Sequence, residues 1–174
     1  MTARRILVYG VTGSGKTTLA SEISRSTEIP WYSVDDLTYM PGWVAVTLED
    51  QRTAIGEICS KDEWILDTAY AMWLDIPLSR AELIVGLDYP RWVSLWRLLK
   101  RTFMRILDGN VVCNGNRESI KTVMSRDSIL LWHFKSFAKK RRRIRQWVAS
   151  EMEVVWLRNP AATAKWLKEV QRSS

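Results

Sequence analysis

Apolar residues fall in five short runs flanked by polar or turn-forming residues, a pattern typical of buried strands. The runs occupy residues 6–9, 30–34, 64–66, 83–87 and 154–157. Between them, apolar positions recur every three or four residues, which predicts helices that bury one face. These helices run through residues 19–23, 47–59, 90–99, 128–149 and 159–170. Strands that alternate with helices need crossover connections, so the pattern predicts an α/β fold whose parallel sheet is covered on both faces.

Helix starts carry recognisable signals. Thr47 stands three residues before Asp50, which resembles a loose capping box, and Asn159 precedes Pro160 at the start of the last helix. Asp88 precedes Tyr89-Pro90 and a predicted helix in a similar way. For Asp88 we therefore favour a capping role over a role in ligand binding.

The chain has 174 residues, which fits a single domain over residues 1–174 with a core of its own. It contains no apolar run of 18 residues, so we expect neither a membrane-spanning helix nor a signal peptide. Cys59 and Cys113 lie far apart without partners at metal-ligand spacing, and we interpret them as reduced thiols of a cytoplasmic protein. The one histidine, His133, excludes a multi-histidine metal site.

Positive charge is concentrated in one third of the chain. The formal net charge is +7, which favours anionic partners. Residues 91–145 hold 15 lysines and arginines against three acidic residues, and the densest stretch is residues 139–145, Lys-Lys-Arg-Arg-Arg-Ile-Arg. Taken alone, such a run is most often a solvated helix face or a weak nucleic-acid patch.

One motif predicts chemistry directly. Residues 10–17, Gly-Val-Thr-Gly-Ser-Gly-Lys-Thr, match the phosphate-loop pattern G-x-x-x-x-G-K-[ST] in full, between a predicted strand and a predicted helix. Glycines let successive N–H groups point at phosphate oxygens, and the helix N-terminus adds partial positive charge. We expect Lys16 to reach the β- and γ-phosphates and the Thr17 hydroxyl to bind Mg²⁺. The predicted nucleotide contacts are Gly10, Thr12, Gly13, Ser14, Gly15, Lys16, Thr17 and Thr18.

Carboxylates follow two further strands. In an open parallel sheet, ligands bind beyond the carboxyl ends of the strands, which is where Asp67 and the pair Asp35-Asp36 are expected. There they are placed to hold Mg²⁺ through water or to orient an attacking hydroxyl. On an extended segment, Asp35 and Asp36 point to opposite sides, so we expect one of them to face the phosphates. The choice between the two stays open.

The order of segments resembles the adenylate kinase and shikimate kinase branch of the phosphate-loop fold. The chain is also similar, nearly end to end, to a small bacterial family of topology modulation proteins described as adenylate kinase-related. The segments that carry the resemblance are residues 5–17, 31–37, 64–70, 87–91 and 113–118. The resemblance implies a three-layer sandwich with a five-stranded parallel sheet, and it implies ATP and Mg²⁺ as cofactors.

The resemblance also implies roles for particular residues. Asp67 corresponds to the aspartate that ends the third strand and orients Mg²⁺ with its waters. Arg97 and Arg101, one turn apart on a helix, correspond to arginines at the base of a lid that closes over the transferring phosphate. The lid-containing segment covers about residues 97–145, and its further candidate cations are Arg141, Arg142, Arg143 and Arg145.

The expected acceptor region departs from adenylate kinases. Residues 36–63, where we expect an acceptor-binding insertion, contain Arg52 and Lys61 as the only cations, and residues 67–70 hold no arginine. A dianionic acceptor needs a bidentate clamp, so AMP is disfavoured. Asp35-Asp36 instead resembles the acids of kinases that phosphorylate a hydroxyl, where one acid is the general base. Aromatic residues that either stack on a flat acceptor or pack this region are Tyr39, Trp43, Tyr70 and Trp73.

The sequence leaves three functional hypotheses. The first is a Mg²⁺-dependent phosphotransferase that moves the ATP γ-phosphate to a nucleoside, nucleotide or other small-molecule acceptor, with Lys16, Arg97, Arg101 and Asp35 or Asp36 as catalytic residues. The second is a DNA-associated ATP-binding regulator, supported by residues 139–145 with Trp132 and Trp147. The third is a nucleotide-binding protein without catalysis. No membrane association is expected in any of them.

Overall fold

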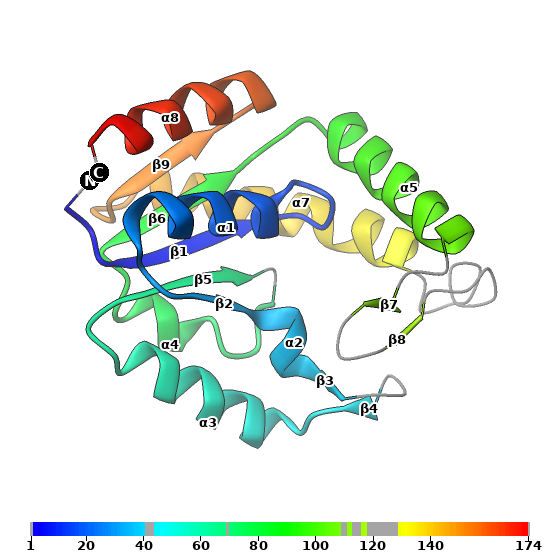
Figure 1. The fold of residues 1–174 in the computed structure, drawn as a ribbon, viewed down its shortest axis with the longest axis horizontal. Coiled ribbons are helices and arrows are strands. Elements are labelled where there is room, and N and C mark those ends of the chain that lie inside the picture. Colours follow the sequence, from blue (N-terminus) through cyan, green and yellow to red (C-terminus); the bar gives the residue numbers. More distant parts are fainter. Residues whose placement is uncertain are drawn as a thin grey trace.

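The computed structural model describes residues 2–40, 44–68, 70–108, 111–112, 116–117 and 129–173, and it describes no side chain of residue 39 or of residues 105–132. Among these residues, five strands form one parallel sheet in the order β2-β5-β1-β6-β9 (Figure 1). The strands are β1 (Arg5–Gly10), β2 (Trp31–Ser33), β5 (Trp64–Thr68), β6 (Leu83–Leu87) and β9 (Val154–Leu157). The predicted fold class is confirmed.

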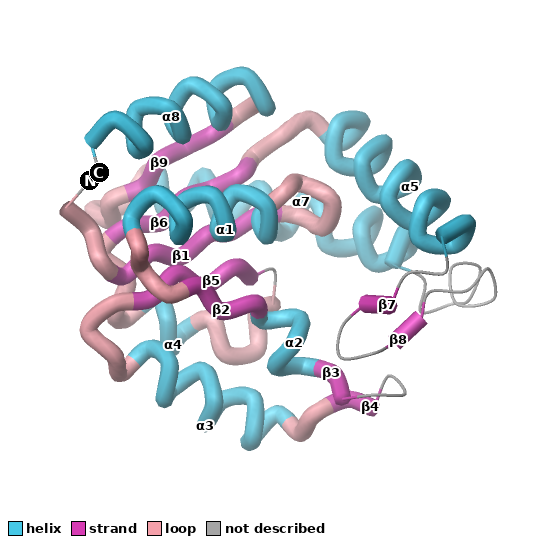
Figure 2. Tube along the Cα trace, in the orientation of Figure 1, coloured by secondary structure: helices cyan, strands magenta, loops and turns pink. Residues whose placement is uncertain are grey.

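Helices cover both faces of the sheet (Figure 2). Successive strand residues point to opposite faces, so Ile6 and Val8 enter one apolar core while Leu7 and Tyr9 enter the other. The first core is closed by α1 (Lys16–Thr27) and α8 (Pro160–Ser173). The second is closed by α3 (Leu48–Cys59), α4 (Asp75–Leu78) and α7 (Ile129–Val148). Because both faces are buried, the central strands read as continuous apolar runs.

The remaining described elements are small or peripheral. Helix α5 (Arg91–Asp108) lies beyond the end of the sheet toward which the strands point (Figure 1). Two short antiparallel pairs also occur within the described ranges, β3 (Tyr39–Met40) with β4 (Val44–Ala45) and β7 (Val111–Val112) with β8 (Asn116–Arg117). In the part of the chain that the structure describes, no helix is long and apolar enough to span a membrane.

The predicted helix caps are present. The Thr47 hydroxyl accepts a hydrogen bond from the Asp50 N–H at 3.2 Å, which satisfies one of the free donors at the start of α3. The Asn159 side chain accepts from the Ala162 N–H at 2.8 Å at the start of α8. Both caps were expected from the sequence alone.

The pair Asp35-Asp36 is placed differently from the expectation. The run that reads as a strand through residue 34 ends at Ser33, and Val34–Thr38 forms the short helix α2. The two carboxylates therefore lie in the first turn of a helix, where negative charge is stabilised by the helix dipole. The two side chains are neighbours on a helix, so they do not point to opposite sides as neighbours on a strand do.

The capping role for Asp88 is wrong. Its carboxylate is buried and pairs with α7: Arg141 Nε donates to Oδ1, and Arg145 Nε lies 3.5 Å from Oδ2. Trp156 Nε1 of β9 also donates to Oδ2 at 3.1 Å. Asp88 thus ties the basic helix to the sheet through a buried ion pair.

We predict that Asp88→Asn lowers the free energy of unfolding by about 3 kcal/mol, because it leaves Arg141 without its counter-ion. Arg141 is 28% exposed, so partial rehydration keeps the loss at the low end for a buried pair. Asp75→Asn is the matched control, since it removes the exposed pair with Arg52 and is expected to cost less than about 1 kcal/mol. Equal midpoints of urea unfolding for the two variants would contradict the assignment.

Candidate nucleotide-binding and active site

The phosphate loop joins β1 to α1 and adopts the backbone that its glycines allow. Gly13 and Gly15 have positive φ values of 80° and 92°, a conformation that other L-residues rarely adopt. A Cβ on Gly13 would lie 2.3 Å from the Ser94 carbonyl oxygen of α5. The loop is therefore pressed against α5, and Gly13 is required both for its φ value and for this close approach.

Cations from two helices, α1 and α5, contact the loop. Lys16 Nζ donates to the Val11 carbonyl at 3.1 Å, and Arg97 Nη1 of α5 donates to the Ser14 carbonyl at 3.2 Å. The Arg97 guanidinium also lies over the Tyr89 ring, 5.4 Å from its centroid. Arg97, expected at the base of a lid, thus contacts the phosphate loop itself.

His133 contacts the phosphate loop, which the sequence did not predict. Its side chain, at the start of α7, has no exposed surface, and Nδ1 lies 3.2 Å from the Thr12 carbonyl oxygen. Burial lowers the pKa of His133, and the Thr12 hydrogen bond raises it in part. The neutral ring with hydrogen on Nδ1 is the form that donates to Thr12. No sequence pattern around this single histidine indicates that it contacts Thr12.

Thr17 and Asp67 form the candidate metal site. Thr17 Oγ1 donates to Asp67 Oδ2 at 2.7 Å, and Trp31 Nε1 donates to Oδ1 at 3.3 Å. Asp67 is 6% exposed at the end of β5. A hydroxyl and a carboxylate are hard oxygen donors, and Mg²⁺ is usually held by one or two such groups together with waters and phosphate oxygens. These residues therefore fit a magnesium ion.

The charged groups of the site influence one another. Burial raises the pKa of Asp67, which the Thr17 hydrogen bond and the Lys16 charge oppose. Burial lowers the pKa of Lys16, which Asp35 and Asp67 oppose, while Arg101 lowers it further. The structure thus brings together Lys16, Asp67, Asp35 and Arg101, four residues that the sequence proposed as site residues.

The structure separates the two acids of α2. Asp35 Oδ1 accepts a hydrogen bond from the Tyr70 hydroxyl at 3.3 Å, and its charge acts on Lys16 and Asp67. Asp36 follows it on the same helix, and both side chains are exposed. The Asp35 carboxylate therefore lies close enough to Lys16 and Asp67 for its charge to act on both.

The basic run on α7 divides into residues with different surroundings. Arg141 and Arg145 pair with Asp88, and Arg143 Nη1 donates to the hydroxyl of the buried Tyr9 at 3.1 Å. Lys140 is 4% exposed, and burial, with Lys16 as the next cause, lowers its pKa to about 7. The exposed members of the run are Lys139, Arg142 and Arg145. Reading 139–145 as one uniform patch missed this division.

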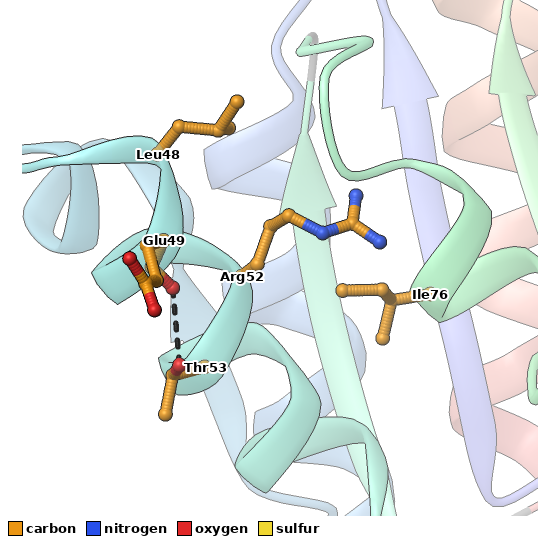
Figure 3. A pocket seen from close by; sticks show the side chains of 5 residues that line it. All are labelled: Leu48, Glu49, Arg52, Thr53 and Ile76. Atoms are coloured by element: carbon orange, nitrogen blue, oxygen red, sulfur yellow. Dashed lines mark hydrogen bonds between the residues drawn. The ribbon is translucent and has the colours of Figure 1, made fainter.

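Residues 36–63, the segment expected to bind the acceptor, contribute no free cation among their described residues. Arg52 forms a bidentate pair with Asp75, with distances of 3.0 and 2.7 Å, and Lys61 donates to the Tyr32 hydroxyl at 2.9 Å. Figure 3 shows Arg52 in a surface hollow of about 580 Å³ between α3 and α4, lined by no residue of the phosphate loop. Arg52 and Lys61 are therefore already engaged away from the site.

The aromatic residues that were proposed to stack on an acceptor lie in different surroundings. Trp73 is fully buried and its Nε1 donates to Gln51 Oε1 at 3.1 Å, so it packs the core. Tyr70 reaches Asp35 and lies at the site. Residues outside the description are Trp43, Cys113, Asn114 and Glu118, together with the side chains of Tyr39, Asn116, Arg117 and Trp132.

Solved kinase structures share this fold. A gluconokinase from Sinorhizobium meliloti 1021 is 19% identical with a TM-score of 0.54, and the match covers 98% of this chain and 97% of that one. A shikimate kinase from Aquifex aeolicus is 21% identical with a TM-score of 0.55, covering 97% and 94%. A shikimate kinase from Acinetobacter baumannii, solved with shikimate, is 16% identical with a TM-score of 0.58, covering 99% and 93%.

The chain therefore has the fold of the phosphate-loop kinases, with the five-stranded parallel sheet of the shikimate kinase and adenylate kinase type. No protein-family model matches the chain, and no curated protein sequence matches it.

We predict that Gly13→Ala destabilises the fold by at least about 2 kcal/mol, because it combines a left-handed φ value with a clash against α5. Gly56→Ala in α3 is the control, since a Cβ there meets nothing within 4 Å, and it is expected to stabilise by about 0.5–1 kcal/mol. Thermal unfolding measures both. A Gly13→Ala protein as stable as the parent would show that the loop is not pressed against α5.

We predict that His133 makes the free energy of unfolding depend on pH below about 6.5. Its folded-state pKa lies below the ordinary 6.5, so its contribution is present above pH 6.5 and is lost as the pH falls through the folded value. His133→Asn keeps an amide donor for the Thr12 carbonyl without titrating. Urea unfolding across this range is expected to show a flatter profile for the variant, and parallel profiles would contradict the prediction.

Proposed function

We propose that the protein is a Mg²⁺-dependent phosphotransferase that moves the γ-phosphate of ATP to a hydroxyl of a small acceptor. The observation that carries the proposal is the convergence of Lys16, Thr17, Asp67 and Asp35 around the phosphate loop. The named structural neighbours include a gluconokinase and shikimate kinases, whose names imply hydroxylated acids as acceptors. A hydroxylated metabolite is therefore the acceptor class that we favour.

The nucleotide's phosphates would bind to the loop N–H groups of residues 10–17, with Thr18 following on α1. Lys16 would exchange its bond to the Val11 carbonyl for phosphate oxygens, which gives the buried ammonium a stronger partner. Thr17 and Asp67 would hold Mg²⁺. Bound there, the ion would neutralise charge on the β- and γ-phosphates.

Asp35 is the proposed general base. It would accept the proton of the acceptor hydroxyl as the oxygen bonds to the γ-phosphorus and the bond to ADP breaks. The Tyr70 hydroxyl would orient the carboxylate. Arg101 and Arg97 would stabilise charge on the transferring group, and the segments 36–63 and 97–145 would serve as acceptor region and lid.

The surroundings of the cations argue against AMP as acceptor. Adenylate kinases grip the acceptor phosphate with arginines, whereas Arg52 and Lys61 are engaged elsewhere. A neutral or singly charged hydroxyl compound needs no bidentate clamp. The chemistry proposed here is therefore transfer to a hydroxyl in a cytoplasmic metabolite.

A DNA-associated regulator, the role suggested by the resemblance to topology modulation proteins, is less well supported. Arg141, Arg143 and Arg145 are bonded to Asp88 and Tyr9, so few cations of the basic run remain for DNA phosphates. Salt-dependent DNA binding by the purified protein would favour this second function.

We predict that the protein consumes ATP with Mg²⁺ in the presence of one acceptor from a panel of sugars, hydroxy acids and nucleosides. Lys16→Ala is expected to abolish the activity, and Asp35→Asn is expected to lower kcat by about 100-fold or more while nucleotide affinity changes little. Asp36→Asn is the matched control and is expected to stay within a few-fold of the parent.

Two outcomes would count against the proposal. A loss of kcat in Asp36→Asn with an active Asp35→Asn would reverse the assignment of the base. Stimulation by no acceptor, including nucleoside monophosphates, would remove the phosphotransferase function.

A further inference from the structure

The buried face of α7 contains a lysine where an apolar residue would be ordinary. His133, Phe137, Lys140 and Ile144 recur at helical spacing, and each is at most 5% exposed. His133 contacts the phosphate loop, and Ile144 packs against Gly86 of β6. Lys140 is therefore buried on the helix face that contacts the loop through His133 and the sheet through Ile144.

The charged groups around Lys140 come from three helices. They are Lys16 of α1, Asp35 of α2 and Arg143 of its own helix, and the charge of Lys140 in turn acts on His133. Lys16 and Asp35 are residues of the proposed phosphotransfer site. Lys140 thus belongs to the same cluster as the phosphate-loop lysine, although it follows Lys16 by more than a hundred residues.

Two amines in one buried cluster repel each other when both are protonated. The described cations Lys16, Lys140, Arg101 and Arg143 meet the carboxylates of Asp35 and Asp67, and this leaves an excess of positive charge. A nucleotide's phosphates bring several negative charges to the loop. Their arrival reverses the local balance and favours the protonated form of every amine close to them.

We propose that Lys140 is a second phosphate-binding lysine of the nucleotide site, and that it takes up a proton from solvent when a nucleotide binds. The inference rests on the proposed function, because it requires that the loop binds nucleotide. Protonation converts the Lys140 amine into an ammonium, and the proton comes from water or buffer. Nucleotide affinity consequently falls as the pH rises above neutrality.

Proton uptake requires that Lys140 is neutral before the nucleotide binds, and the surroundings of Lys140 favour this form. Burial is the largest cause that lowers its pKa, Lys16 and Arg143 lower it as well, and Asp35 raises it, with a resulting pKa of about 7. At pH 8 most of the unliganded protein then carries a neutral Lys140. Binding of phosphates at that pH is expected to take up close to one proton per nucleotide.

Titration calorimetry with MgADP at pH 8, in buffers of different ionisation enthalpy, measures this uptake without turnover. The parent protein is expected to take up about one proton. Lys140→Met is expected to lose most of the uptake and to bind about tenfold or more weakly. Lys140→Arg is expected to bind MgADP without proton uptake, because a guanidinium stays protonated.

Lys139→Met is the matched control, since Lys139 is the exposed neighbour in the same helix and both readouts are expected to stay unchanged. Lys140→Arg keeps the test valid if Lys140→Met fails to fold.

Binding of MgADP by the parent without proton uptake would overturn the inference and leave the proposed function standing. Undiminished uptake in Lys140→Met or Lys140→Arg would also overturn it and would assign the proton to another group such as Lys16. An absence of MgADP binding in the parent would overturn the proposed function together with the inference.

Discussion

The candidate site depends on the ion pairs that the buried carboxylate of Asp88 forms with α7. It holds Arg141 and Arg145 of α7 and Trp156 of β9, so it fixes the rotation of α7 about its axis. That rotation directs His133 to the phosphate loop, Lys140 to the interior and Arg143 to Tyr9. A helix with this many cations would otherwise turn its charged side to water, since burying unpaired charge is costly.

The electrostatic state of the site follows from the same arrangement. Burial disfavours the charged forms of Lys16, Lys140, His133 and Asp67 alike, and each group is shifted toward its neutral form. Such a cluster is tolerated in the folded protein because the carboxylates of Asp35 and Asp67 partly offset the cations. A polyanion at the loop would supply further negative charge, so the excess of positive charge favours the binding of a phosphate group.

The sequence predicts the parts of this arrangement that are local. The phosphate loop, the strands, the caps at Thr47 and Asn159 and the acid near the end of β5 all rest on short patterns with a direct physical cause. The fold class follows from the alternation of these elements. The helix at residues 34–38 was missed because Val34 extends an apolar run, and three strand residues give too short a signal to fix the end of β2.

The remaining site features depend on long-range contacts that no local pattern encodes. Asp88 resembles a helix cap until α7, more than fifty residues later, is packed against it. The run at residues 139–145 looks uniform, and only the packed helix separates Lys140 from Lys139. Helical spacing from His133 would place residue 140 on the same face, which is the one available signal.

The distribution of charge also constrains the acceptor. Cations gather around the phosphate loop, whereas in the proposed acceptor region Arg52 pairs with Asp75 and Lys61 lies over the Tyr32 ring. In the proposed reaction the group that would face the acceptor from α2 is the carboxylate of Asp35, and a carboxylate repels a second phosphate while it attracts a hydroxyl proton. Polarity therefore runs across the site from excess positive charge at the loop to negative charge at α2. An acceptor that presents a hydroxyl to α2 fits this gradient, and one that presents a dianionic phosphate opposes it.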